Sequence, residues 1–247
     1  MPATSADFRA ALRLLFAGSS AAILGWSPCW GADPWGGSVG VVSDYVERGV
    51  TKSDNHPAIQ LDWHYVDKSG VAAGVAASSA QIDPHERTNA ELSAFAGFNW
   101  TFDTDWRGKA QATYYAYPWD IHGSRYNYEE VALDAAYDDW LDLRFAYSPN
   151  WPRIVPYTGI VNSPSISTEL NLQVPLYPHL FATAGTGYAH QGGAGAADYV
   201  YWSVGAAYEL APFSFVLSYA GTSEAATDLF PLSAVRRRWL GSIIWRF

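Results

Sequence analysis

Twelve ionisable residues recur at alternate positions of segments whose other positions are apolar. Residues two apart in an extended strand share a face, so these charges should project from one side of a sheet. Charges of both signs on one face suit a wet interior, where they select ions or small solutes or form internal ion pairs. The candidate pore-lining residues are Asp44, Arg48, Asp62, His64, Glu91, Arg107, Lys109, Glu130, Asp134, Arg144, Glu169 and Arg246.

The segments that carry these charges are predicted to be about twelve β-strands. In one of them Ile59, Leu61 and Trp63 alternate with Gln60 and Asp62. About ten tilted residues cross the hydrocarbon layer of a membrane, which is the length observed here. The predicted strands are Ser38–Val50, Ala58–Val66, Val71–Ile82, Ala90–Phe102, Trp106–Tyr117, Glu129–Tyr137, Leu141–Ser148, Ser165–Val174, Leu180–His190, Tyr199–Leu210, Phe213–Gly221 and Arg238–Phe247.

The connections between these strands alternate strictly between short and long. The short ones are Asp67–Gly70, Asp103–Asp105, Asp138–Trp140, Leu176–His179 and Ala211–Pro212. The long ones are Thr51–Pro57, Asp83–Asn89, Pro118–Tyr128, Pro149–Pro164, Gln191–Asp198 and Thr222–Arg237. This order predicts an all-β, antiparallel up-and-down transmembrane barrel with tight periplasmic turns and longer extracellular loops. A soluble sandwich is the alternative fold, although its connections have no reason to alternate.

The last strand has an apolar, aromatic face that ends at Phe247, the final residue. A terminal Phe on such a strand resembles the signal that the bacterial outer-membrane assembly machinery reads. For the barrel to close, this strand must pair with the first. That pairing should place Arg246 beside the start of the first strand and Arg238 near Arg48.

The composition favours an exported membrane protein. Aromatic residues make up 16% of the chain, as interfacial girdles require. Residues 1–32 have the pattern of a signal peptide and contain Cys29, the single cysteine, leaving 33–247 as one barrel domain. The net charge of −9 argues against nucleic acid as a partner.

Other functions remain as alternatives. An integral outer-membrane enzyme acting on lipid would need a Ser–His pair with an orienting group, and the best histidine candidate is His64. Metal ligation has no closed set: His85 adjoins Asp83 and Glu86, and His122 follows Asp120. A structural or surface-recognition barrel would use the aromatic loops Tyr126–Tyr128 and Trp151–Tyr157 as a contact surface, unless these aromatics pack beneath the loops. No cofactor is expected.

One stretch resembles a bacterial family of outer-membrane porins, the TorF-like family with the Gcw_chp domain. The resemblance runs from Ser43-Asp44-Tyr45-Val46-Glu47-Arg48-Gly49 through Ser53 to Pro57 and Gln60. It implies an outer-membrane barrel but no particular substrate. Glu47 departs from the aromatic residue expected there. Because a carboxylate is costly against lipid, we expect Glu47 near the outer rim. Arg48 should share a strand face with Asp44 and pair with it or with Asp62.

Together these features predict a porin-like channel in the outer membrane of a Gram-negative bacterium. Its lumen should be narrow and lined by charge, and it should pass ions or small solutes passively. Leu240 and Ile244 on the inward face of the last strand favour a constricted lumen. The expected partners are outer-membrane lipid, the barrel assembly machinery and the solutes themselves.

Overall fold

The computed structural model describes residues 34–81, 89–119, 125–155, 159–193 and 195–247. The predicted signal peptide over 1–32 lies outside these residues. The described part of the chain contains no helix that is both long and apolar enough to cross a membrane.

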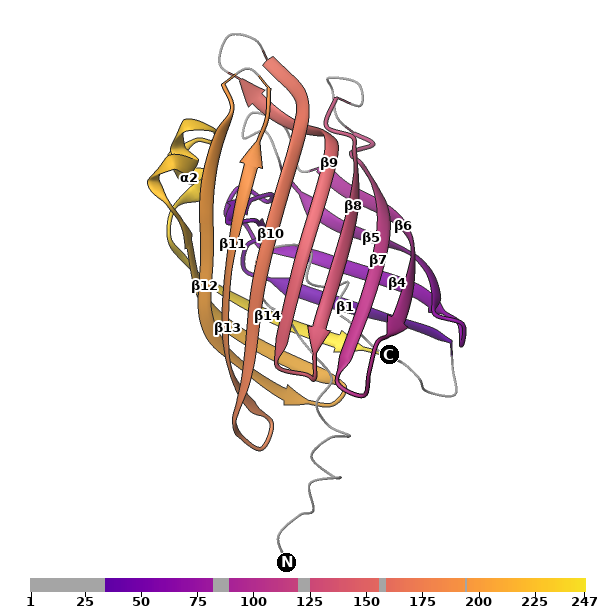
Figure 1. Cartoon of the computed structure of the whole chain (residues 1–247). Helices are drawn as coiled ribbons and strands as arrows, with labels where there is room; N and C mark the ends of the chain where they lie inside the picture. The colour runs from indigo at the N-terminus through magenta and orange to yellow at the C-terminus, as the bar shows by residue number, and fades with distance from the viewer. Residues whose placement is uncertain (1–33, 82–88, 120–124, 156–158, 194) are drawn as a thin grey trace, which may run out of the picture.

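The chain forms a closed antiparallel barrel of twelve strands, each paired with its neighbours in sequence (Figure 1). This confirms the predicted fold. The barrel strands are β1 (Trp35–Val42), β4 (Ala58–Val66), β5 (Val71–Ala80), β6 (Asn89–Thr101), β7 (Trp106–Ala116), β8 (Tyr128–Tyr137), β9 (Leu141–Val155), β10 (Gly159–Tyr177), β11 (Leu180–Gln191), β12 (Ala197–Leu210), β13 (Phe213–Thr222) and β14 (Arg238–Arg246). A two-stranded hairpin, β2 (Val46–Glu47) and β3 (Val50–Thr51), is separate from the barrel sheet.

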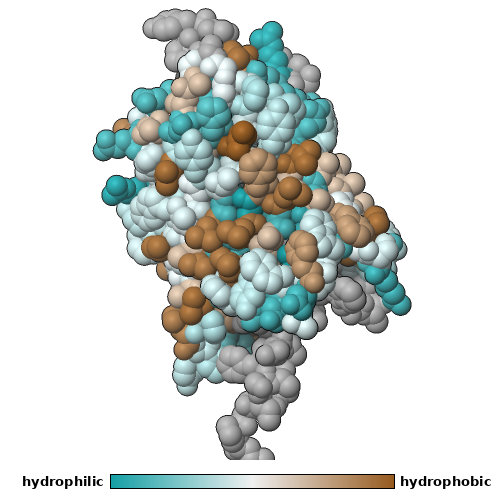
Figure 2. All heavy atoms as spheres, in the orientation of Figure 1, coloured by the Kyte–Doolittle hydropathy of each residue, from teal (hydrophilic) through white to brown (hydrophobic). Residues whose placement is uncertain are grey.

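The barrel is apolar outside and polar inside. On β4, Ile59 and Trp63 are more than half exposed, whereas Asp62 between them is buried. Figure 2 shows apolar residues gathered over the middle of the face that it displays. Soluble monomers rarely expose contiguous apolar surface on this scale. The closed barrel and its inverted surface show that the soluble-sandwich alternative is wrong.

The short connections lie together at one end of the barrel, which we call the short-turn end. At the first of them, the Asp67 carboxylate accepts hydrogen bonds from the backbone N–H groups of Ser69 (2.8 Å) and Val71 (3.1 Å). Gly70 has φ +98° there, in the left-handed region that glycine favours. The C-terminus lies at this end (Figure 1). We call the opposite end the long-loop end.

The barrel closes between β1 and β14 through five residue pairs, from Ser38 with Arg246 to Val42 with Ser242. The predicted seam is therefore confirmed, as is the position of Arg246 beside the start of β1. At the far end of the seam, Ser43 N–H donates to the Gly241 carbonyl (2.8 Å), and its Oγ accepts from Gly241 N–H (2.9 Å).

The first strand is shorter than predicted. It ends at Val42 instead of Val50, and the chain then turns into the barrel interior. We call residues 43–57 the inner segment; it contains β2 and β3. The predictions that Asp44 and Arg48 share a barrel strand face and that Thr51–Pro57 is an outer loop are both wrong.

The predicted loop Pro149–Pro164 is also wrong in large part, because β9 and β10 continue pairing through Gly159 and Val155. The register shifts between Ser163 and Ser165, on either side of Pro164. Proline lacks the N–H that a regular ladder needs, and a bulge tolerates it. This long hairpin carries Trp151 and Arg153 beyond the predicted end of their strand.

The last long connection, between β13 and β14, contains a 3-10 helix, η2 (Glu224–Asp228), and one helical turn, α2 (Leu232–Val235). Buried Ala226, Leu229 and Val235 pack with Ala189, Tyr199 and Tyr201. This packing holds the connection against the strands at the long-loop end.

Candidate functional site

The inner segment closes on itself around Asp44. The Asp44 carboxylate accepts a hydrogen bond from Ser53 Oγ (2.9 Å), which itself accepts one from Tyr45 N–H (2.8 Å). The tip turns at Arg48 (φ +50°) and Gly49 (φ +78°). These two successive residues in the left-handed region form the turn between β2 and β3, which reverses the chain inside the barrel.

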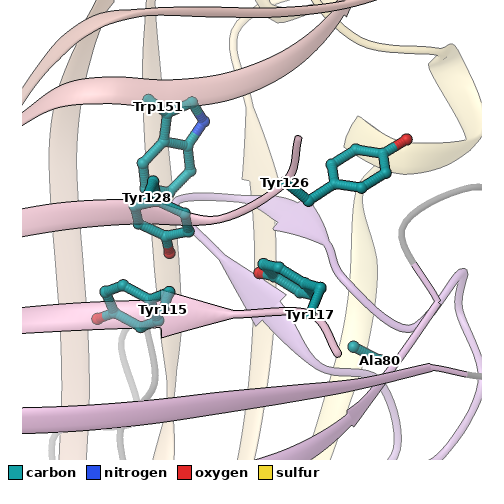
Figure 3. Close-up of a cluster of buried hydrophobic side chains, with 6 residues drawn as sticks. All are labelled: Ala80, Tyr115, Tyr117, Tyr126, Tyr128 and Trp151. Carbon is teal, nitrogen blue, oxygen red and sulfur yellow. The ribbon is translucent and has the colours of Figure 1, made fainter. Parts of the chain in front are cut away.

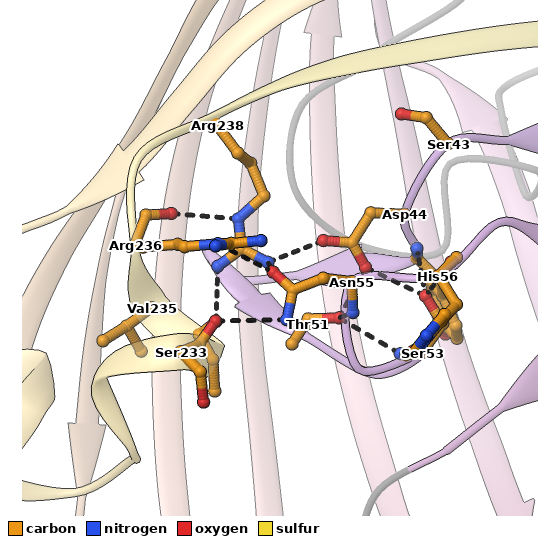
Figure 4. A network of polar contacts seen from close by, with 12 residues as sticks. Ser43, Asp44, Thr51, Ser53, Asn55, His56, Ser233, Val235, Arg236 and Arg238 are labelled. Carbon is orange, nitrogen blue, oxygen red and sulfur yellow. Dashed lines mark hydrogen bonds and ion pairs between the residues drawn. The ribbon is translucent and has the colours of Figure 1, made fainter. Parts of the chain in front are cut away.

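One side of the inner segment is fastened to the β13–β14 wall, as Figure 4 shows. Arg238 Nη1 lies 2.6 Å from Asp44 Oδ2 and 2.9 Å from Asn55 Oδ1. Arg236 Nε also donates to Asn55 (3.1 Å), whose amide donates to the Ser233 carbonyl (3.2 Å). Arg238 therefore lies beside Asp44, and the prediction that it lies near Arg48 is replaced by this contact.

From the tip of the segment, the Arg48 side chain reaches the opposite wall. Arg48 is buried and forms an ion pair with Glu130 on β8. Its guanidinium also lies 4.5 Å from the centre of the Trp151 ring, a cation–π contact. Glu130 in turn pairs with Arg144 on β9 (3.1 Å). The predicted partners of Arg48, Asp44 and Asp62, are both wrong, because the Arg48 side chain reaches Glu130 on β8 instead.

Lys52 forms a second attachment to that wall. Its ammonium forms an ion pair with Glu47 and lies 2.7 Å from Glu91 Oε2 on β6. It donates to the hydroxyls of Tyr117 and Tyr128, both at 3.1 Å. Glu47 is thus buried within the lumen, and the prediction that it lies near the outer rim is wrong: Lys52 compensates its charge where no lipid is present.

Aromatic rings surround the Lys52 ammonium. The rings of Tyr45, Tyr115, Tyr117, Tyr128 and Trp151 have their centres 5.2 to 5.8 Å away. Four of these rings, Tyr115, Tyr117, Tyr128 and Trp151, belong to the buried cluster in Figure 3, where Tyr115 stacks on Tyr128 with ring centres 4.3 Å apart. The aromatics predicted to lie in loops at Tyr126, Tyr128 and Trp151 are therefore packed in this cluster; Tyr157 lies outside the described residues.

The surroundings of Lys52 and Glu47 raise the pKa of both side chains. Burial disfavours the Lys52 ammonium, but the Glu47 and Glu91 carboxylates outweigh it and raise the pKa of Lys52 well above its ordinary value. Burial raises the pKa of Glu47, and Lys52 and Arg48 offset only part of that effect. The Lys52 ammonium is therefore a permanent cation.

The other predicted site residues lie on inward faces. Asp134 pairs with Arg144 (2.9 Å) and Lys109 (3.5 Å), and Tyr201 donates to Glu169 (2.8 Å). That these residues line a conducting path remains a prediction.

Towards the short-turn end, His64 Nδ1 lies 3.0 Å from Asp62 Oδ1, Arg107 pairs with Asp139 (2.7 Å), and Arg246 lies 3.8 Å from Glu209. His64 thus faces the lumen and not the lipid.

The residues that sequence reasoning missed are Glu47 and Lys52 as partners, together with their aromatic surroundings. One signal was present: Gly49, Ser53, Asp54 and Asn55 are turn-forming residues within a supposed strand and its loop. No cluster of three or more metal-ligating side chains occurs among the described residues. The predicted metal candidates His85 and His122 lie outside that part of the chain.

A pocket of about 410 Å³ lies above the inner segment at the long-loop end; we call it the vestibule pocket. Lys52 and Glu47 belong to its lining, and Tyr117, Tyr128 and Trp151 contribute aromatic walls. Tyr199 and the β13–β14 connection line the other side.

A closed twelve-strand barrel with an apolar exterior, a charged interior and an inward-folded segment has the fold of the small outer-membrane porins. The KdgM porin superposes with a TM-score of 0.54 at 10% identity, covering 86% of this chain and 99% of that one. The KdgM porin in complex with disordered oligogalacturonate gives 0.53 at 10% identity over the same shares of the two chains. The NanC porin gives 0.53 at 8% identity, over 85% and 97%.

The sequence identifies the family. Residues 32–243 match the Gcw_chp family, described as a bacterial protein of unknown function, and the chain belongs to it. None of the curated proteins matches the sequence. The resemblance seen in the residues around Ser43–Gly49 is thereby confirmed at the level of the family.

Proposed function

We propose that this protein is a narrow outer-membrane channel through which ions and small uncharged solutes diffuse passively. The observation that carries the proposal is the inner segment, which joins one barrel wall through Asp44–Arg238 and the opposite wall through Arg48–Glu130. A segment attached on both sides reduces the open cross-section of a barrel of this size. The bore is therefore set by the space around the inner segment.

The interior charges support weak ion selectivity. Most of the inward-facing cations among the described residues contact a carboxylate. Arg144 pairs with both Glu130 and Asp134, and Lys52 with both Glu47 and Glu91. A ring of uncompensated charge of one sign is what gives a pore strong selectivity. A lumen whose cations are already paired instead favours neutral solutes and discriminates little between small cations and anions.

This pairing separates the proposed solutes from the ligand of one structural neighbour. The KdgM porin forms a complex with oligogalacturonate, a chain of negatively charged sugars. A polyanion needs unpaired cationic groups to replace its hydration. Since Arg48 and Lys52 already have carboxylate partners, we expect acidic oligosaccharides to pass poorly through this barrel.

Orientation and assembly follow from the same proposal. Porin barrels place short turns in the periplasm, so the vestibule pocket would face the cell exterior and Phe247 the periplasm. Phe247 would serve as the signal for the assembly machinery, and residues 1–32 as the export signal. The aromatic, apolar outer face would contact outer-membrane lipid.

Single-channel recording in planar bilayers tests the proposal. The wild type should show small steps with a reversal potential near zero in a salt gradient. Asp44→Asn and Arg238→Met each break the attachment of the inner segment to the β14 wall and should enlarge the steps. Asp198→Asn is the matched control, because its ion pair with His190 (2.5 Å) lies on the outer face. Absence of steps from the wild type and from both inner-segment variants would refute a channel.

A further inference from the structure

The vestibule pocket has the size and composition of a ligand site. Its volume of about 410 Å³ lies within the range of roughly 300–1,000 Å³ typical of small-molecule pockets. Its aromatic walls come from separate parts of the chain: Tyr117 and Tyr128 from β7–β8, Trp151 from β9, Tyr199 from β12, and Phe230 from the β13–β14 connection. Tyr199 and Phe230 meet edge to face with ring centres 5.8 Å apart.

Charged groups interrupt these aromatic walls. Lys52 and Glu47 belong to the lining, as do the carboxylates of Asp54 and Asp228. A wholly apolar ligand would remove water from these groups without replacing their hydrogen bonds, at a cost of a few kcal/mol for each polar group. The pocket therefore suits a molecule with apolar faces and hydrogen-bonding edges.

The charges of the lining disfavour an ionic ligand. An anion gains little from Lys52, because two carboxylates already neutralise its ammonium. Arg153, the other cation of the lining, already donates to the Gly195 carbonyl (2.7 Å), and Asp54 and Asp228 would repel an anion. A cation would be attracted to the faces of the aromatic rings, but the Lys52 ammonium already occupies that position. It lies within 5.8 Å of five ring centres. A neutral ligand avoids both penalties.

We propose that the vestibule pocket binds a short, uncharged saccharide. The C–H faces of a pyranose ring stack on aromatic side chains, and its hydroxyls donate to carboxylates and accept from an ammonium. Asp228 and Asp54 would accept hydrogen bonds from the sugar edge, and Phe230 would cover one ring face. This inference deepens the proposed channel function. It rests on that function only where it places the pocket on the path of the solute.

Isothermal titration of the refolded, detergent-solubilised barrel tests the site without reference to conductance. Maltose is the uncharged probe, digalacturonate the acidic one and indole the apolar one. Maltose should bind. Digalacturonate and indole should bind at least about tenfold more weakly, which corresponds to roughly 1.4 kcal/mol of binding free energy. Binding of digalacturonate or indole as tight as that of maltose, or no binding of maltose, would overturn the proposal.

Two pairs of variants locate the binding. Phe230→Ala should weaken maltose binding about threefold to tenfold through the lost ring contact, whereas Leu232→Ala, an exposed neighbour outside the pocket, should not. Asp228→Asn should weaken it about fivefold through the lost charge-assisted hydrogen bond, with Glu224→Gln on the same 3-10 helix as control. Equal effects of variant and control in both pairs would place the sugar elsewhere.

The two proposals fail in different ways. Conductance steps without maltose binding would remove the saccharide site and leave the channel. Maltose binding that Phe230→Ala weakens, in a barrel without conductance, would support the site and remove the channel. Because Phe230 and Asp228 lie in the β13–β14 connection outside the barrel strands, a normal heat-modifiable gel shift confirms that each variant is folded.

Discussion

The Nζ atom of Lys52 lies 2.7 Å from Oε2 of Glu91, although Lys52 enters the lumen from the β1 side and Glu91 belongs to β6. Tyr45, the third residue of the inner segment, donates its hydroxyl to the other oxygen of the same carboxylate (2.7 Å). Tyr45 precedes β2 and Lys52 follows β3, so Glu91 binds both ends of the β2–β3 hairpin.

Replacement of Lys52 by Met should destabilise the inner segment strongly. It leaves the buried carboxylates of Glu47 and Glu91 without their cation, and breaking a buried ion pair in this way costs about 3–5 kcal/mol. Chemical unfolding of the refolded barrel, followed by its gel mobility shift, measures the loss. Lys68→Met, in an exposed turn, should have no comparable effect. The double variant Lys52→Met/Glu47→Gln should recover part of the loss, and a double variant no better than the single one would contradict the pairing.

The pH dependence of stability should carry a contribution from Glu47. Burial raises the pKa of this carboxyl in the folded protein above its unfolded value. Between the two values the folded state keeps a proton that the unfolded state has released, so this contribution is complete below the unfolded pKa and is lost as pH rises through the folded pKa. The melting temperature of wild type relative to Glu47→Gln should therefore fall as pH rises above the unfolded pKa of about 4.3. A melting-temperature difference that rises with pH would mean that the folded protein lowers the pKa of Glu47.

Gly49→Ala should destabilise the tip of the inner segment by about 1–3 kcal/mol. Gly49 has φ +78°, and an added Cβ would lie 2.4 Å from Cγ2 of Thr222. Gly241→Ala is the matched control, since a Cβ there meets no atom within 4 Å. Thermal melts of both variants in detergent make the comparison, and similar melting temperatures for the two would contradict the packing of the tip against β13.

Phe247→Ala should lower the amount of barrel assembled in the outer membrane of cells without lowering the yield of refolding in detergent. The backbone of Phe247 exchanges two hydrogen bonds of 3.1 Å with Gly37, and these survive the substitution. The aromatic ring, which is mostly exposed and lies beside Trp245 with ring centres 5.1 Å apart, is then the only group removed. Fractionation of membranes measures assembly. Parallel losses in cells and in detergent would mean that the ring stabilises the barrel instead of signalling.

The barrel itself could be predicted from the sequence because its pattern is local. Each strand has one face towards lipid and one towards the interior, so residues such as Ile59 and Asp62 report their environments without reference to other strands. The second strand, Ala58–Val66, was predicted with its observed bounds for this reason. The alternation of connection lengths is equally visible along the chain.

Only the tertiary structure decided where the inner segment lies and which charges meet. Arg48 and Glu130 are 82 positions apart, and their pairing depends on how the closed barrel curves β8 around the chain after β1. Val42, Val46 and Val50 recur on one face of an extended chain, so the spacing of these valines does not mark the true end of β1. A local pattern shows which face of a strand is buried. It does not report the element that buries it, because that element comes from elsewhere in the chain.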